Sequence, residues 1–377
     1  MTITDLCSQF NVEPISIEEL CQGLINVSYV VTDKNNKRYL LQEINSRVFT
    51  DIDAVMKNIE KTTRHITIKA YQLGRDTDRS SLRLLPTKTG NSYITVFDNN
   101  NNAHYYRMFN FIENARTYDE ANEKILYECG VGYGKFQKDL ADFPASQLVE
   151  TIPNFHNTHA RYVNFTNLIF KLRKEGKIDK LKEVYPEIST AVEYGLKYSD
   201  LIVSALNQGE IPLRVVHNDT KLNNIMIDNE TKKALCAIDL DTVMPGSMLY
   251  DYGDAIRSCA NTGAEDDKDI NNVGLDVSKF TAFTAGYLSE IANCVTNEEL
   301  RYMPVAPAVI AYELGLRFLT DYIEGNKYFK CDPTRPHHNL ERARAQFKLM
   351  KEFEKHENEM RNIISNLYSN CIEDQFN

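Results

Sequence analysis

The sequence predicts an α+β fold with two lobes: a small β-rich N-terminal lobe over residues 1–112 and a larger helical C-terminal lobe over residues 113–377. Three observations support this prediction. Strand-like apolar runs dominate the first lobe, helical patterns dominate the second, and a single hairpin signal near residue 230 interrupts the helices. With 377 residues and 42% hydrophobic content, the chain is long enough to form two substantial lobes with a sizeable buried core.

The N-terminal lobe is predicted to contain two hairpins with a helix between them. A helix begins at about Asp51, because Asp51 or Thr50 can cap its first turn and an apolar face follows. Four consecutive asparagines, residues 99–102, predict a solvated turn between the last two strands. The strand-like runs, in chain order, are 29–31, 38–42, 93–97 and 104–109.

The C-terminal lobe is predicted to be helical on both sides of its hairpin. Apolar residues recur there at helical spacing, which is the pattern of helices with one face against a core. The helical segments are expected at 141–151 around a proline, 187–207, 278–294, 307–324 and 339–369.

The hairpin is predicted from two apolar runs, 225–228 and 234–238, around the polar turn 229–233. Symmetric pairing about this turn places Asn224 opposite Asp239 at the open end. Opposed residues of an antiparallel pair have Cβ atoms roughly 4.5–5.5 Å apart, so an amide oxygen and a carboxylate can share one hard cation there. The pairing therefore predicts a metal site at Asn224 and Asp239, with Mg²⁺ as the expected ion.

The loop before this hairpin carries further polar residues at a regular spacing. His217, Asp219, Lys221 and Asn224 form the pattern H-x-D-x-K-x-x-N, and Asp239 follows at the end of a strand. This order resembles the catalytic loop and metal-binding Asp of the protein-kinase-like superfamily, and implies a two-lobed protein-kinase-like fold with a catalytic β-hairpin. It implies Asp219 as the catalytic base, and Lys221 as a second catalytic residue that offsets phosphate charge together with Mg²⁺.

Charge and composition exclude several classes of partner. The net charge is −10 and no basic stripe is present, so a nucleic-acid partner is not expected. The sequence shows neither a signal segment nor an apolar stretch long enough to span a bilayer, so we expect a cytoplasmic protein without a membrane partner. The eight cysteines form no C-x-x-C pair and no metal-ligand spacing.

Candidate nucleotide-binding residues lie in two places. Gly23, Asn26 and Ser28 precede the first predicted strand, 29–31, where a kinase has its phosphate loop. One Gly alone is equally compatible with a plain loop. Asn110 and Ile112 lie between the lobes, where the backbone either pairs with adenine or only links the lobes. Gln42 stands where ordinary kinases have a strand Lys, so charge neutralisation is expected to rely on Mg²⁺ and Lys221.

A narrower resemblance covers residues 20–330. The segments LQEIN at 41–45, FIENARTYD at 111–119, FQKDLADFP at 136–144, IPNFHNT at 152–158 and IDLDTVMPG at 238–246 are similar to those of the N-acetylhexosamine 1-kinases, a group within the aminoglycoside-phosphotransferase and choline-kinase-like enzymes. The resemblance implies ATP-dependent phosphorylation of the anomeric hydroxyl of N-acetylglucosamine or N-acetylgalactosamine, in hexosamine salvage. It also implies that Arg317 and Tyr328, together with Asp219, contact the sugar substrate.

Three further carboxylates lie after the hairpin. Asp251, with Asp254 nearby, stands where the superfamily has an acidic residue that braces the catalytic loop. Asp241 reaches either a substrate, a second ion or only solvent in a turn.

Two kinds of alternative function stay open. The enzyme alternative is a related kinase for choline, homoserine or an aminoglycoside, which needs an aromatic cage or an acidic wall in its pocket. The other alternative is a pseudokinase that binds nucleotide without turnover. The joint presence of Asp219, Lys221, Asn224 and Asp239 argues against the pseudokinase.

Overall fold

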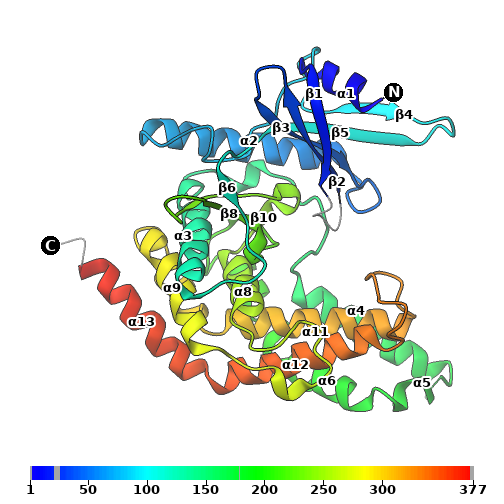
Figure 1. Cartoon of the computed structure of the whole chain (residues 1–377). Coiled ribbons are helices and arrows are strands. Elements are labelled where there is room, and N and C mark those ends of the chain that lie inside the picture. The colour runs from blue at the N-terminus through cyan, green and yellow to red at the C-terminus, as the bar shows by residue number, and fades with distance from the viewer. Residues whose placement is uncertain (1, 21–25, 178, 374–377) are drawn as a thin grey trace.

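The structure of the protein is a computed structural model that describes residues 2–20, 26–177 and 179–373. It has two lobes, with a β-sheet in the N-terminal part and mostly helices in the C-terminal part (Figure 1). The predicted α+β fold, with a small β-rich lobe before a larger helical lobe, is confirmed. The division between residues 112 and 113 stays a prediction.

The N-terminal lobe is built on an antiparallel sheet of five strands in the order β1-β2-β3-β5-β4. The predicted hairpins are present as β2 with β3 and β4 with β5. Because β3 pairs with β5 directly, the two hairpins form one continuous sheet. The strands are β1 (Pro14–Leu20), β2 (Val27–Asp33), β3 (Arg38–Ile44), β4 (Ile94–Phe97) and β5 (Ala103–Asn110).

Two helices cover the two faces of this sheet. The short helix α1 (Ile3–Gln9) packs its Leu6 and Cys7 against Leu41 and Met108 on one face. The long helix α2 (Ile52–Gln72) lies on the other face, where it shares a hydrophobic core with Phe109 of β5. The same core continues into the C-terminal lobe. Asp51 caps α2 by accepting a hydrogen bond from the Ala54 N–H at 2.9 Å, so this side chain fixes where the predicted helix begins.

The C-terminal lobe combines helices with two small sheets, which lie on its side toward the N-terminal lobe (Figure 1). One sheet has the order β6-β8-β9 and the other pairs β7 with β10. The strands are β6 (Ala115–Arg116), β7 (Arg214–Val216), β8 (Ile225–Asp228), β9 (Ala234–Ala237) and β10 (Met244–Gly246). The helices are α3 (Glu123–Asp139), α4 (Thr158–Lys174), α5 (Asp179–Lys182), α6 (Tyr185–Tyr198), α7 (Leu201–Asn207), α8 (Met248–Cys259), α9 (Val277–Ile291), α10 (Asn297–Tyr302), α11 (Ala306–Glu324), α12 (His338–Lys355) and α13 (Glu357–Glu373).

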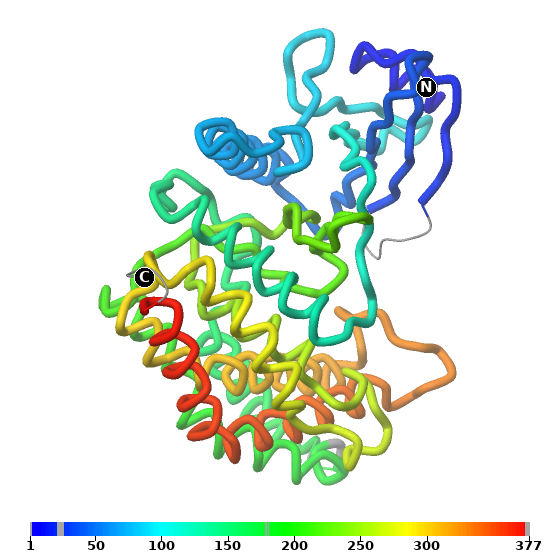
Figure 2. Tube along the Cα trace, turned by 60° about the vertical axis from the view of Figure 1, so that its left-hand side comes forward, coloured from blue at the N-terminus to red at the C-terminus, as the bar shows by residue number. Residues whose placement is uncertain are grey.

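Helices α3 and α9 lie side by side in close contact, because glycines stand where they meet (Figure 2). A Cβ atom on Gly286 would lie 1.9 Å from the Tyr127 carbonyl oxygen, and one on Gly130 would lie 2.1 Å from the Phe283 carbonyl oxygen. On another face of α3, Gly132 leaves room for Ile225 of the hairpin strand β8. The hairpin therefore rests on a helix pair that is packed backbone against backbone.

Three helix predictions were wrong in extent. The predicted helix 187–207 is divided into α6 and α7, and the predicted helix 339–369 is divided at His356 into α12 and α13. Residues 141–151 contain only the short 3₁₀ helix Ala145–Gln147. Pro144 explains that difference, since a proline disfavours helical backbone at the residue before it and has no N–H to donate.

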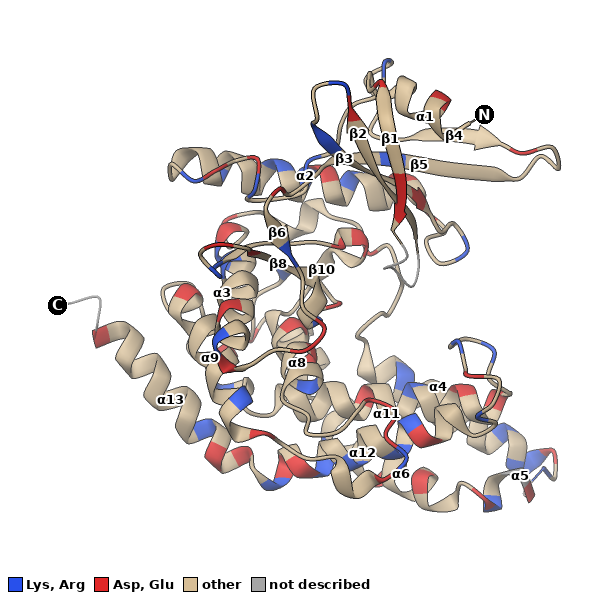
Figure 3. Cartoon of the chain, in the orientation of Figure 1, with Lys and Arg blue, Asp and Glu red and all other residues tan. Residues whose placement is uncertain are grey.

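Lys and Arg positions are interspersed with Asp and Glu positions along the ribbon in Figure 3, without a continuous basic strip along any labelled element. Within the described part of the chain, every helix is too short or too polar to cross a membrane. The cytoplasmic location expected from the sequence stays a prediction.

Candidate active site

The loop between β7 and β8, which the sequence predicts to be the catalytic loop, is held in place by a buried carboxylate. Asp251, in the first turn of α8, accepts hydrogen bonds from the backbone N–H groups of His217 at 2.8 Å and Asn218 at 2.7 Å. Gln137 of α3 donates to the same carboxylate at 2.9 Å. Burial raises the pKa of Asp251, although His217 and the two backbone donors oppose that shift. Asp251 thus fixes the loop backbone, in the bracing position that the sequence indicated.

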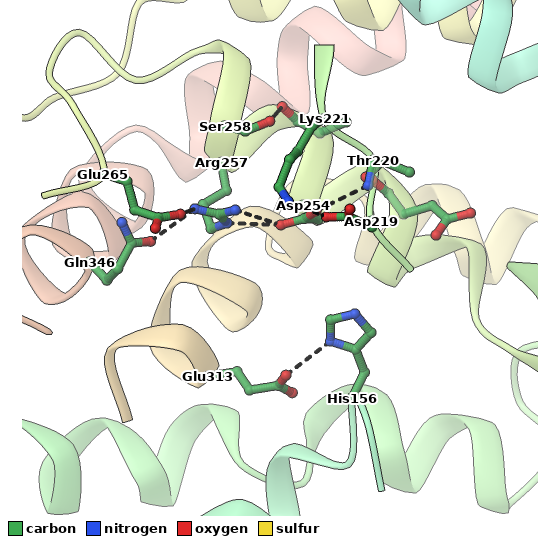
Figure 4. A network of polar contacts seen from close by, with 12 residues as sticks. His156, Asp219, Thr220, Lys221, Asp254, Arg257, Ser258, Glu265, Glu313 and Gln346 are labelled. Atoms are coloured by element: carbon green, nitrogen blue, oxygen red, sulfur yellow. Dashed lines mark hydrogen bonds and ion pairs between the residues drawn. The ribbon is translucent and has the colours of Figure 1, made fainter. Parts of the chain in front are cut away.

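Asp254 supports the next residue of the loop from the same helix (Figure 4). Its carboxylate accepts from the Thr220 N–H at 3.2 Å and pairs with Arg257 at 2.8 Å. Burial alone would raise the pKa of Asp254, but the charge and hydrogen bond of Arg257, together with the charges of His156 and Lys221, outweigh it and hold the pKa below its usual value. The loop therefore rests on an ionised carboxylate that is itself paired.

Asp219, Lys221 and Asn224 lie in contact at the upper side of this loop. Lys221 Nζ lies 2.8 Å from Asp219 Oδ1. The Asn224 amide donates to the Asp219 carbonyl oxygen at 2.9 Å and approaches its carboxylate at 3.3 Å. The Asp219 side chain is 24% exposed, so this carboxylate can meet a substrate while its position is fixed.

The predicted register of the hairpin was wrong by one residue. Ile225 pairs with Ala237, and the Ile238 N–H donates to the Asn224 carbonyl at 2.9 Å, so Asn224 faces Ile238 and not Asp239. The pairing shifts again between Met226 and Ile227. The turn explains this asymmetry, because the Asp228 side chain accepts from two backbone N–H groups inside it.

Asp239 nevertheless returns toward the loop through an unusual backbone conformation. It has φ 60° and ψ 59°, in the left-handed region, where Asp is tolerated better than most residues. Burial and the negative charges of Asp241 and Asp219 raise its pKa to about 6. These carboxylates therefore lie close enough to repel one another.

This donor set fits a hard divalent cation. Carboxylate and amide oxygens are the ligands that Mg²⁺ prefers, and a cation would offset both the burial and the repulsion that raise the pKa of Asp239. Among the residues that the structure describes, no three Asp, Glu, His or Cys side chains converge on one metal position. Asn224 and Asp239 would thus hold an ion together with oxygens from another source.

Asp241 is buried and is not the solvent-facing turn residue considered from the sequence. Its side chain is 4% exposed, forms an ion pair with Arg107 of β5, and accepts from the Asn26 amide at 2.6 Å. Sequence reasoning missed Arg107. The available signal was an Arg in a predicted strand, with Phe109 two residues later on the same buried face.

The expected nucleotide residues are mostly engaged with the protein. Gly23 lies outside the described residues. Asn26 contacts Asp241 with its amide nitrogen and accepts from the Asn45 N–H at 3.0 Å, while the Ser28 hydroxyl accepts from Gln42 at 3.0 Å. Their contact with a nucleotide stays a prediction.

The interlobe residues are also engaged. The Asn110 N–H donates to the Arg83 carbonyl at 3.0 Å, and its side-chain amide bonds the backbone of Asp78 and Arg83. Ile112 is buried. Pairing of adenine with this segment stays a prediction, and the Asn110 N–H is not free to take part.

The structure brings together Arg317 and Tyr328, which lie 11 residues apart in the chain. The Arg317 guanidinium carbon lies 5.5 Å from the ring centre of Phe155, 6.0 Å from Tyr328 and 5.4 Å from Phe329. Asp321 fixes the loop after α11 by accepting from three successive backbone N–H groups, those of residues 327–329. Tyr328 itself remains 67% exposed.

A buried pair lies between this region and the catalytic loop. His156 Nδ1 lies 2.9 Å from Glu313, one helical turn before Arg317, and the Thr158 hydroxyl donates to the same carboxylate at 2.7 Å (Figure 4). His156 also stacks on Tyr250 of α8, with ring centres 5.1 Å apart. Sequence reasoning assigned no role to His156 or Glu313, because nothing in the sequence shows that they meet.

The fold resembles that of several solved structures. Amicoumacin kinase hAmiN, solved with AMP-PNP, Ca²⁺ and Ami, is 15% identical with a TM-score of 0.60, covering 92% of each chain. A microcompartment-associated aminopropanol kinase is 14% identical with a TM-score of 0.58, covering 94% of this chain and 97% of that one. An aminoglycoside phosphotransferase from Alicyclobacillus acidocaldarius is also 14% identical at 0.58, covering 99% and 97%. These similarities confirm the predicted two-lobed protein-kinase-like fold.

The sequence also matches a family model. The model described as "Phosphotransferase enzyme family" matches residues 16–282, which include the catalytic loop, the hairpin and Asp251. Helix α11, with Arg317, lies beyond the matched residues. Because the match spans more than half of the chain and contains the whole catalytic loop, the protein belongs to this family of phosphotransferase enzymes.

Proposed function

We propose that the protein is an ATP- and Mg²⁺-dependent kinase that phosphorylates the anomeric hydroxyl of N-acetylglucosamine or N-acetylgalactosamine. The observation that carries the phosphotransfer is the contact of Asp219 with Lys221 and Asn224 on a loop held by Asp251. The sugar assignment rests on the resemblance to N-acetylhexosamine 1-kinases and on the proximity of Arg317 to Tyr328.

In this mechanism Asp219 accepts the proton of the sugar hydroxyl and orients its oxygen toward the γ-phosphorus. Lys221 stabilises negative charge on the transferred phosphoryl group, since its ammonium already lies beside Asp219. Asn224 and Asp239 would hold the Mg²⁺, which supplies further charge neutralisation when bound.

Arg317 would donate hydrogen bonds to sugar hydroxyls or to the acetamido carbonyl, and Tyr328 would offer a ring face and a hydroxyl. Rings on several sides already limit the positions of the guanidinium, so less side-chain freedom is lost on binding.

The charge around Arg317 favours a neutral acceptor over a cationic one. Arg161 of α4 donates to the Phe155 carbonyl at 3.1 Å and Arg317 lies over the Phe155 ring, so two guanidinium groups lie near each other; burial and the charge of Arg317 accordingly lower the pKa of Arg161. The nearby carboxylate of Glu313 is already engaged with His156 and Thr158. A choline or aminoglycoside acceptor would therefore be repelled, which weighs against the amine-kinase alternatives.

A substrate panel tests the proposal. ADP formation is measured with N-acetylglucosamine, N-acetylgalactosamine, glucose, galactose, choline, homoserine and an aminoglycoside, each with and without Mg²⁺. We expect kcat/KM for an N-acetylhexosamine to exceed that for the plain sugars by roughly 10-fold or more, because a plain sugar lacks the acetamido group and would leave a donor such as the half-buried Arg317 unpaired.

The product of the same reactions gives an independent check. ³¹P NMR should show a phosphate at the anomeric carbon that is lost in mild acid. An acid-stable 6-phosphate, or faster turnover of choline or homoserine, would contradict the sugar 1-kinase assignment. Absence of turnover with all acceptors, but with measurable ATP binding, would favour a pseudokinase.

A further inference from the structure

Arg107 is a buried cation in the N-terminal sheet that the catalytic scheme above does not use. It lies on β5 directly opposite Gln42 of β3, and Gln42 lies opposite Ser28 of β2. The three side chains thus form a row across adjacent strands on the sheet face that packs against α2. Gln42, on the neighbouring strand β3, stands where ordinary kinases have a strand Lys. Arg107 is therefore one strand away from that position.

The guanidinium of Arg107 is held in one plane by its neighbours. Gln42 Oε1 accepts from Nε at 3.1 Å and from one terminal nitrogen at 2.9 Å, and Asp241 pairs with the other terminal nitrogen. The Phe109 ring centre lies 5.0 Å from the guanidinium carbon. Arg107 is only 1% exposed, so its orientation is fixed by contacts and not by solvent.

The Asp241 edge of this guanidinium lies at the metal-binding end of the hairpin. Asp241 is two residues after Asp239 and forms the ion pair with Arg107. A guanidinium nitrogen that pairs with a carboxylate oxygen can equally pair with a phosphate oxygen. An anionic ligand at the metal site would therefore meet one terminal nitrogen of Arg107 that is already oriented, because Gln42 holds the other two.

We propose that Arg107 is the N-lobe cation that binds the phosphates of the nucleotide, in the role that a strand Lys fills in ordinary kinases. A phosphate oxygen would replace the Asp241 oxygen that pairs with the guanidinium in the structure. Gln42 would keep its two hydrogen bonds and so hold the orientation of the guanidinium. The inference rests on the ATP dependence proposed above but not on the identity of the acceptor.

A purely structural role would give a different result. Arg107 also joins the sheet to the segment after the hairpin. Loss of such a structural link would weaken the binding of every nucleoside ligand alike. A phosphate contact affects only ligands that carry phosphates. The ratio of ATP affinity to adenosine affinity therefore separates the two roles.

The experiment measures dissociation constants for ATP, ADP and adenosine in the presence of Mg²⁺, for the full chain and for the variants R107Q and R107K. We expect R107Q to weaken ATP binding about 10- to 100-fold, the range for loss of a charged hydrogen bond, and to leave adenosine binding within about 2-fold. R107K keeps the charge without the fork and should lie between the full chain and R107Q, and it provides the measurement if R107Q does not fold.

The matched control is R75Q. Arg75 forms another Arg–Asp pair between the segment after α2 and the C-terminal lobe, at 2.8 Å from Asp139, and makes no contact with the hairpin among the described residues. Its ATP-to-adenosine ratio should not change. Equal weakening of ATP and adenosine by R107Q and R107K, or no weakening of either, would overturn the inference. Failure of the unmodified protein to bind ATP would instead contradict the proposed function.

Discussion

The predicted catalytic loop and the region around Arg317, which is the proposed acceptor side, are built in different ways. The loop at 217–224 is fixed through its backbone by buried carboxylates, with Asp251 only 2% exposed. The acceptor side relies on side chains that stack around Arg317 and on an exposed Tyr328 after α11. The family match covers the first region and ends before Arg317 and Tyr328 of the second. We infer that phosphotransfer is determined by rigid backbone and acceptor choice by adaptable side chains.

The largest effect is expected at the base. Asp219→Asn keeps the shape but cannot accept the proton, so turnover should fall about 10²- to 10⁴-fold while ATP affinity changes little. Single-turnover kinetics and nucleotide titration measure the two quantities separately. Near-normal turnover would show that another group accepts the proton.

The metal site gives the next largest effect. If Asn224 and Asp239 hold the same Mg²⁺, replacing either by Ala should raise the Mg²⁺ concentration for half-maximal rate by roughly 10-fold or more, and replacing both should add little. A double-mutant cycle over Mg²⁺ concentration tests this. Additive losses would mean that the two residues act independently.

Substitution of Asp251 tests whether hydrogen bonds to the loop backbone contribute to turnover as much as the reacting side chains do. Asp251→Ala leaves the N–H groups of His217 and Asn218 without their acceptor, so we expect stability to fall by about 2–4 kcal/mol and turnover by roughly 10- to 100-fold. Urea unfolding and kcat are the measurements. Asp251→Asn keeps one acceptor oxygen and should lose less of both.

On the acceptor side the effect should be smaller and confined to one substrate. Arg317→Ala should raise KM for the sugar by about 10-fold, since a charged hydrogen-bond donor is lost, and leave KM for ATP unchanged. Arg342→Ala is a matched control, because Arg342 also stacks on an aromatic ring, that of Phe318. Equal changes in both KM values would show that the acceptor side is coupled to the loop.

The smallest effect concerns the buried pair of Glu313 and His156. Burial would raise the pKa of Glu313, but the charge and hydrogen bond of His156 outweigh it and hold the pKa below its usual value of 4.5. The ionised carboxylate therefore stabilises the fold at neutral pH, and this contribution is lost as the pH falls below about 4.5 and through the lower folded value.

Glu313→Gln should accordingly destabilise the protein by about 1–2 kcal/mol at pH 7. The difference from the unmodified chain should shrink progressively below pH 4.5. Urea denaturation at several pH values measures it. A difference that is constant with pH would mean that the charge of Glu313 contributes nothing.

Local signals predicted much of the fold from the sequence. Asp51 begins α2 as expected, and both hairpins of the N-terminal sheet have the predicted strands. The residues at the catalytic loop also meet as their spacing indicated, since they lie within a few positions of one another.

Features that depend on distant contacts could not be predicted. The pair of Arg107 and Asp241 joins residues 134 positions apart, and that of His156 and Glu313 joins residues 157 apart. The hairpin register failed for a different reason, because the Asp228 side chain shapes the turn asymmetrically. Alternation of apolar residues does not reveal a shift of one residue in pairing.

The close packing of α3 on α9 has a consequence for redesign of the protein. Even a single methyl group at Gly130 or Gly286 would meet a backbone carbonyl oxygen at about 2 Å, so the helix beneath the hairpin would have to move. A directed-evolution library for new acceptors should therefore leave these two glycines unchanged and vary residues around Tyr328. Mutational scanning would then show almost no accepted substitutions between α3 and α9, and many in the loop after α11.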